Sequence, residues 1–166
     1  KLPKVLFASD AMGASSSDSS SHDHGGYGVV VTNINKHECC DLLANSEHLG
    51  RAVARLNGDF SGLKKPEKQL RPTVPFSLLA PAITETSRWQ PVAAGRWRYA
   101  DHIALGEARA VLKVVHAIST VPSAHQHLHF SLQDNMSVGG SMTKGRSPAF
   151  ALNFILRKKA AACLSS

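Results

Sequence analysis

A helix that leads into a strand is the feature that most constrains how this chain can fold. Between Leu105 and Ile118, apolar residues recur at helical spacing along one stripe, and Pro122 follows. From His127 to Leu132, apolar and polar residues alternate, which predicts a strand. Asp134 lies just after this segment. The order predicts an α/β domain in which the helix packs on a sheet.

Two more strands are expected near the N-terminus. An apolar run from Lys4 to Ser9 ends at Asp10, and β-branched residues fill the segment from Tyr27 to Thr32. We expect these two segments to pair as a hairpin with a long, Ser-rich loop between them. The segment from Trp89 to Tyr99 mixes aromatic residues with Arg and indicates a third strand, although its two Trp residues could equally serve packing.

Further helices are predicted from Glu38 to Leu56 and after Pro148, which suits the first turn of a helix. Five prolines, from Pro66 to Pro91, predict irregular structure in the segment that follows the first of these two helices. We interpret residues 57–88 as an inserted, Pro- and Lys-containing arm. With 166 residues, of which 43% are hydrophobic, residues 1–166 are expected to form one domain.

The charge of the chain is unevenly distributed. Residues 1–50 hold three Lys or Arg against six Asp or Glu, a net charge of −3, so residues 51–166 hold +10 of the total of +7. A basic body suits a polyanion such as RNA or DNA, although surplus Lys on a solvated surface would give the same count.

The remaining composition excludes some classes of protein. No run of about 18 apolar residues is present, so no membrane span is expected. The three cysteines, Cys39, Cys40 and Cys163, lack C-x-x-C spacing, which favours reduced thiols and an intracellular protein. There is no phosphate-binding glycine loop and no G-x-S-x-G motif, so nucleotide hydrolysis and serine hydrolase chemistry have no support.

Three acidic residues occupy related positions in this order of elements. Asp10 ends the first strand, Glu107 lies one turn into the central helix, and Asp134 ends the following strand. If the first and last strands are neighbours, Asp10 and Asp134 converge at one sheet edge and Glu107 can point toward them. Carboxylate oxygens on rigid elements suit Mg²⁺ or Mn²⁺, and two such ions could activate water against a phosphodiester.

Each acid also has a simpler interpretation. Asp10 could be a turn residue, Glu107 a solvated helix acid, and the pair Asp134–Asn135 a helix cap. Their shared placement favours the metal site over three separate structural roles.

Five blocks of the sequence stand out together, and they are Asp10–Ala11, Gly26–Val29, His102–Val111, Asp134–Asn135 and Lys144–Ser147. In these blocks the sequence resembles the ribonuclease H domain of reverse-transcribing retroelements, particularly DIRS-like and related elements. The resemblance covers residues 1–35 and about 89–160. It implies a ribonuclease H-like mixed sheet flanked by helices, with Asp10, Glu107 and Asp134 as catalytic metal ligands.

The chain departs from that family in three places. The family supplies a fourth carboxylate after the last helix, whereas Asp134 is the last acid of this sequence. An unusual Ser/His/Asp loop separates the first two strands, and the arm at residues 57–88 is an insertion.

Three functions remain open. The first is metal-dependent cleavage of RNA in an RNA–DNA hybrid. The second is a catalytically inactive module that binds RNA or proteins within a ribonucleoprotein such as an organellar ribosome, and the third is protein docking alone. The candidate nucleic-acid-binding residues are the basic side chains Lys64, Lys65, Lys68, Arg71, Arg96, Arg98, Lys144 and Arg146.

Overall fold

The computed structural model describes residues 5–13, 24–45, 81–99 and 101–166. Within these ranges, one sheet contains four strands in the order β3-β2-β1-β4. The strand bounds are β1 Val5–Met12, β2 Gly26–Asn33, β3 Gln90–Arg96 and β4 Phe130–Leu132. β1 and β3 each pair antiparallel with β2, and β4 pairs parallel with β1, so the sheet is mixed.

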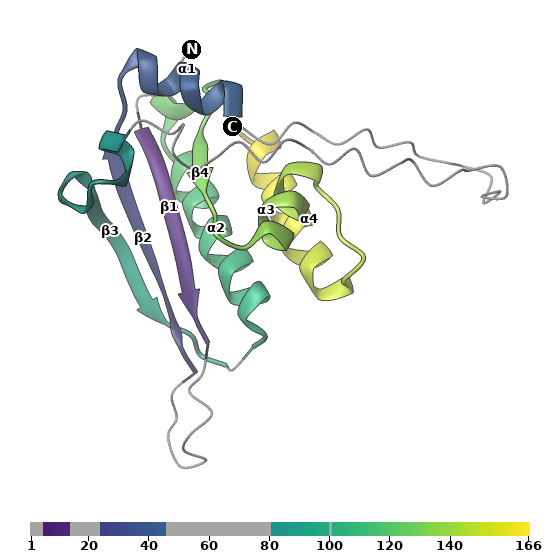
Figure 1. Cartoon of the computed structure of the whole chain (residues 1–166). Coiled ribbons are helices and arrows are strands. Elements are labelled where there is room, and N and C mark those ends of the chain that lie inside the picture. The colour runs from purple at the N-terminus through teal and green to yellow at the C-terminus, as the bar shows by residue number, and fades with distance from the viewer. Residues whose placement is uncertain (1–4, 14–23, 46–80, 100) are drawn as a thin grey trace, which may run out of the picture.

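Four α-helices accompany the sheet in the described part of the chain. Their bounds are α1 Lys36–Asn45, α2 Ile103–Ser119, α3 Met136–Lys144 and α4 Phe150–Leu164. Figure 1 shows α2 alongside the sheet, α3 and α4 beyond it, and α1 across one end of the strands. None of these helices is long and apolar enough to cross a membrane. The prediction of an α/β fold with a mixed sheet flanked by helices is confirmed.

β1 and β2 form the predicted hairpin, in which Val5 pairs with Asn33 and Met12 with Gly26. Gly25 precedes β2 with a φ of 75°, and a Cβ atom on it would lie 2.1 Å from the carbonyl oxygen of Met12. Only glycine fits there. The Gly25 carbonyl accepts a hydrogen bond from the backbone N of Trp97 at 3.0 Å, which ties the end of β3 to the hairpin. Residues 14–23 of the Ser-rich loop lie outside the described residues.

A glycine lets α2 approach β1 closely. A Cβ atom on Gly106 would lie 3.3 Å from the Cβ of Ala11 and 3.4 Å from the indole Nε1 of Trp97. Both separations are shorter than an optimal carbon–carbon contact, so a larger residue would push α2 away from the sheet. The close approach carries the next residue of the helix, Glu107, up to β1.

Two apolar clusters stabilise this arrangement. The first joins α2, α3 and α4 through the buried residues Ala108, Val111, Val138, Met142, Leu152, Ile155 and Leu156. The second joins β1, α1 and the segment before β3 through the buried residues Leu6, Ile34, Cys39, Leu42 and Ile83. Leu6, Cys39, Ala108 and Val138 have no exposed surface, so burial of apolar area anchors both clusters.

α1 begins with a pair of reciprocal hydrogen bonds. The side-chain Oδ1 of Asn35 accepts from the backbone N of Glu38, and the Glu38 Oε2 accepts from the backbone N of Asn35, both at 2.9 Å. This capping box satisfies two backbone donors that a helix start leaves free. Arg88 donates to Glu38 Oε1 at 2.6 Å and to the Asn33 carbonyl at 2.7 Å. The bond from Arg88 lowers the pKa of Glu38 despite its burial.

The last part of the predicted arm is ordered, which corrects the expectation of irregular structure. Residues 81–88 form two 3₁₀ turns, Pro81–Thr84 and Thr86–Arg88. Ile83 is only 2% exposed, and its carbonyl accepts a hydrogen bond from the indole Nε1 of Trp89 at 2.9 Å. Pro81 stands at the start of a turn, where a missing N–H costs nothing. Residues 57–80 of the arm lie outside the described residues.

Three element boundaries differ from the predictions. β1 continues past Asp10 to Met12, so Asp10 lies inside the strand. β4 begins only at Phe130, because the preceding histidines bond through their rings to backbone carbonyls and leave the ladder. The predicted helix from Glu38 is present as far as Asn45, and residues 46–56 lie outside the described residues.

The helix α3 was expected only under the alternative interpretation of Asp134–Asn135 as a helix cap. It contains the adjacent residues Gly139 and Gly140, which lower helix propensity by about 1 kcal/mol each. Two other features favour it. Asn135 caps its N-terminus, and Gly145 ends it in the left-handed conformation with a φ of 70°.

Candidate metal centre

The structure brings Asp10, Glu107 and Asp134 together. Each offers one carboxylate oxygen, and these three atoms all lie within 4.8 Å of one another. Asp10 comes from β1, Glu107 from α2, and Asp134 from the turn between β4 and α3. Asp10 and Asp134 are exposed, whereas Glu107 is buried. The arrangement is thus a cluster of three acids with one buried member.

Strand register explains why the two aspartates meet. β4 pairs parallel with β1 so that Leu6 lies beside Phe130 and Ala8 beside Leu132. The same offset, continued by two residues, sets Asp10 level with Asp134. A side-chain hydrogen bond keeps this offset beyond the ladder, because Gln133 Nε2 donates to Ser9 Oγ at 2.9 Å. The residue before each aspartate therefore joins the middle of β1 to the end of β4.

Local hydrogen bonds position the chain on either side of the cluster. The Oδ1 of Asp10 accepts from the backbone N of Ala11 at 2.7 Å. The Oδ1 of Asn135 accepts from the backbone N of Ser137 at 3.0 Å and of Val138 at 3.2 Å, so Asn135 is the cap of α3. The helix-cap interpretation is therefore confirmed for Asn135. The neighbouring Asp134 does not cap the helix and lies in the acid cluster.

Glu107 is the unusual member of the cluster. Its residue is 7% exposed, and its Oε2 atom is buried without a hydrogen-bond partner among the described residues. Burial raises the pKa of Glu107, and the charges of Asp134 and Asp10 raise it further, whereas a hydrogen bond from Asn135 and the nearby His102 lower it. The interpretation of Glu107 as a solvated helix acid is wrong, because water does not reach the unpartnered oxygen.

The donor set fits a hard divalent cation. All three groups are carboxylates, which suit Mg²⁺ or Mn²⁺, and none is a thiol or imidazole of the kind that favours Zn²⁺. A buried carboxylate oxygen without a partner costs free energy unless something compensates it. A cation held by Asp10, Glu107 and Asp134 would supply that compensation.

The predicted nucleic-acid-binding residues do not gather at one place. Lys144 and Arg146 line a depression of about 390 Å³ that runs along α3 from Met136 and Ser137. Arg96 and Arg98 line a different depression, near Tyr27 and Trp97. The remaining candidates, in the predicted arm, lie outside the described residues; they are Lys64, Lys65, Lys68 and Arg71.

Sequence reasoning missed the residues that position the acids. Gln133 and Ser9 join the end of β4 to β1, and Gly106 lets Glu107 approach β1. The only signal was their adjacency to the predicted acids, since each stands immediately before Asp134, Asp10 or Glu107.

Comparisons with known proteins identify no relative of this chain. No protein-family model matches it, and no curated protein and no solved structure matches it either. The geometry of the described residues is therefore the basis for any functional assignment.

Proposed function

We propose that the protein is a divalent-cation-dependent hydrolase of nucleic-acid phosphodiester bonds, of the ribonuclease H type, with RNA in an RNA–DNA hybrid as its substrate. The observation that supports this most strongly is Glu107, whose Oε2 is buried without a partner and which offers a carboxylate oxygen within 4.8 Å of one oxygen from each of two exposed aspartates. The ribonuclease H resemblance of the sequence independently selects the same three acids.

The charges of the cluster favour a bound cation. Among the residues that the structure describes, no ion pair of Asp10, Glu107 or Asp134 with a Lys or Arg is present. Three carboxylates at this separation repel one another, and the burial of Glu107 weakens the screening by water. A site of this kind is unfavourable alone and becomes favourable when a cation binds.

Each acid has a defined part in the proposed reaction. A divalent ion held there would neutralise phosphate charge and lower the pKa of water. The exposed Asp10 and Asp134 face solvent, where a substrate phosphate can arrive, and Glu107 holds its carboxylate out of water behind them. The hydrogen bond from Gln133 to Ser9 keeps β1 and the end of β4, and hence the two aspartates, at a fixed separation.

A basic depression beside the acids offers a contact for the substrate backbone. It begins at Met136, two residues after Asp134, and reaches Lys144 and Arg146 at the far end of α3. Hydroxyl groups of Ser137 and Ser141 also line it. Lys, Arg and Ser side chains are the usual partners of nucleic-acid phosphates. We therefore infer that the strand to be cut runs along α3.

One observation favours a second candidate function. The acid cluster has three members within the described residues, whereas the ribonuclease H family uses four carboxylates. A catalytically inactive module that binds RNA or protein in a ribonucleoprotein would retain the fold and the basic surface without the fourth acid. The two acids of the Ser/His/Asp loop, Asp18 and Asp23, lie outside the described residues.

Cleavage of a labelled RNA–DNA hybrid in Mg²⁺ or Mn²⁺ tests both candidates. The purified chain is compared with Asp134→Asn and with Glu85→Gln, an exposed acid remote from the cluster. We expect cleavage that Asp134→Asn abolishes and Glu85→Gln preserves. Absence of cleavage together with salt-sensitive RNA binding would support the inactive module instead. Cleavage unaffected by Asp134→Asn would exclude the acid cluster as the active site.

A further inference from the structure

A large groove lies on the side of α2 that is turned away from Glu107. It has a volume of about 970 Å³ and is bounded by β2, β3, α2 and α4. A second depression of about 330 Å³ shares four of its lining residues, Tyr27, Trp97, Arg109 and Lys113, and extends it toward Arg96 and Arg98. We call the two together the aromatic groove.

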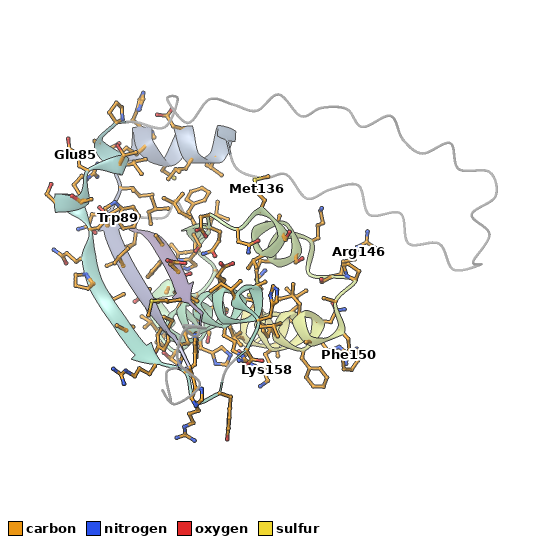
Figure 2. The ribbon with its side chains drawn as sticks, turned by 60° about the horizontal axis from the view of Figure 1, so that its bottom comes forward. Glu85, Trp89, Met136, Arg146, Phe150 and Lys158 are labelled. Carbon is orange, nitrogen blue, oxygen red and sulfur yellow. The ribbon has the colours of Figure 1, made fainter. Side chains whose placement is uncertain are left out.

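Helix geometry separates the aromatic groove from the acid cluster. Arg109, Lys113 and His116 face the groove and repeat at spacings of four and three residues, so they form one stripe of α2. Glu107 precedes Arg109 by two residues, which is a rotation of about 200° around the helix. α2 therefore stands between the groove and the acids. In Figure 2, Phe150 and Lys158 lie on the lower side of the helices, whereas Met136 lies on the upper side.

The titratable side chains that line the groove are basic apart from its tyrosines. Arg109, Lys113, His116 and Lys158 line the main part, Arg96 and Arg98 line the extension, and none of these described lining residues is acidic. The one acid paired with a lining residue is Asp101, which bonds to Arg109 at the rim. The groove consequently has the charge that attracts a polyanion.

Aromatic rings lie beside these cations at both ends of the groove. Tyr27 and Trp97 have ring centroids 4.7 Å apart, and Lys113 Nζ lies 4.7 Å from the centroid of Tyr27. At the other end, Phe150 and Phe154 are 73% and 53% exposed, and their centroids are 5.6 Å apart. Arg157, which does not itself line the groove, lies 5.9 Å from the centroid of Phe154, and Lys158 lines the groove on the same helix. Phe150 and Phe154 form an exposed aromatic pair of the kind that marks a surface that binds a partner, whereas Tyr27 and Trp97 are half-buried.

We propose that the aromatic groove binds single-stranded nucleic acid, with bases on Trp97, Phe150 and Phe154 and phosphates on the lysine and arginine side chains beside them. An apolar surface that only docks a protein would not need a cation beside each ring pair. Repeated ring-and-cation pairs match a ligand in which each unit has one flat base and one negative phosphate. The groove thus adds a binding site to the proposed function and does not depend on cleavage at the acids.

Binding is measured with a fluorescein-labelled twelve-nucleotide oligouridylate in EDTA, so that no divalent ion occupies the acid cluster. We expect saturable anisotropy, and an affinity whose logarithm falls against log salt by about 0.7 for each phosphate contacted. The sequence has two tryptophans, so Trp89→Phe leaves Trp97 as the only one. Trp89 does not line the groove, and its indole donates to the carbonyl of Ile83 (Figure 2 labels Trp89). We expect the oligonucleotide to quench the remaining Trp97 emission.

Two variants place the binding in the groove. Phe150→Ala with Phe154→Ala should weaken binding by about five- to 150-fold for each base that loses a stacking partner. Lys158→Gln should weaken it and reduce the salt slope by about 0.7, whereas the matched control Lys36→Gln on α1 should do neither. All four side chains are exposed, so the variants should retain the melting temperature of the wild type.

Several results would overturn the assignment. Equal losses from Lys158→Gln and Lys36→Gln would mean that net charge alone attracts the oligonucleotide. Binding without quenching of Trp97 would exclude the groove. A labelled peptide of alternating Glu and Leu that binds more tightly than the oligonucleotide, and loses affinity in the Phe150→Ala, Phe154→Ala variant, would identify an acidic protein partner instead. Asp134→Asn should leave oligouridylate binding intact, which separates a failure of the groove from a failure of the proposed cleavage.

Discussion

Glu107→Gln should stabilise the protein in the absence of metal and remove its response to metal. The wild-type carboxylate lies within 4.8 Å of two others. One such pair costs about 0.9 kcal/mol at a dielectric constant of 80 and about 3.5 kcal/mol at 20. Asp10 and Asp134 are exposed, so the lower figure is the better guide for each pair. Relief of two pairs should then raise the free energy of unfolding by about 1–3 kcal/mol.

Thermal unfolding in EDTA at pH 7.5 measures this gain. For a chain of this size, about 1–3 kcal/mol corresponds to a rise of about 3–10 °C in melting temperature. The raised pKa of Glu107 means that its ionisation destabilises the folded state as pH rises above the ordinary carboxyl value. The higher stability of the Glu107→Gln variant should therefore disappear as pH falls below about 4, where the wild-type carboxyl is protonated in the folded and the unfolded state.

Addition of Mg²⁺ or Mn²⁺ should make the melting temperature of the wild type higher than that of Glu107→Gln. Binding at 100 times the dissociation constant stabilises the wild type by about 2.7 kcal/mol, and the variant has lost a buried ligand. The charge-matched control Glu85→Gln should respond to metal as the wild type does. The interpretation of Glu107 as an uncompensated metal ligand is wrong if Glu107→Gln lowers the melting temperature in EDTA. It is also wrong if metal raises the melting temperatures of the wild type and the variant equally.

Three further predictions concern residues outside the acid cluster that stabilise the fold. Arg88→Met removes the ion pair of the Glu38 carboxylate and should lower the midpoint of urea unfolding at pH 7. Because the pKa of Glu38 is lowered, the pair stabilises the fold above the ordinary carboxyl pKa and is lost as pH falls, so the difference between the two proteins should shrink from pH 6 to pH 3. Asn35→Ala removes the cap of α1 and should cost about 1 kcal/mol in the same assay. Gly25→Ala meets the Met12 carbonyl and should lower stability by at least about 2 kcal/mol, with a smaller loss for Gly28→Ala, which has open space around it.

The hairpin and α2 could be predicted because each follows a single local pattern. β-branched residues fill β2, and one apolar stripe runs through α2, so tertiary contacts only had to agree with local preference. The meeting of Asp10 with Asp134 also followed from the sequence, on the single assumption that the first and last strands are neighbours. The structure meets that assumption through the parallel ladder between β1 and β4.

The elements that were missed depend on contacts between distant residues. α3 contains Gly139 and Gly140, and it is stabilised by the burial of Val138 and Met142 against α2 and α4, which no local pattern reveals. Residues 81–88 were predicted to be irregular because they belong to a proline-rich segment, yet Ile83 is buried in the cluster that contains Leu6 of β1 and Cys39 of α1. The buried state of Glu107 was likewise not predicted, because it depends on how closely α2 approaches β1 at Gly106.

The parallel pairing of β1 with β4 has a consequence for the order of folding. Its three residue pairs join segments that are 124 positions apart in the chain, whereas β1 and β2 are neighbours along it. Closure of so long a loop is entropically costly and slow, so the hairpin should form first and β4 should dock late. Asp10 and Asp134 remain apart until that last step. A nascent or partly unfolded chain therefore lacks the acid cluster, and any activity at that cluster reports on completed folding.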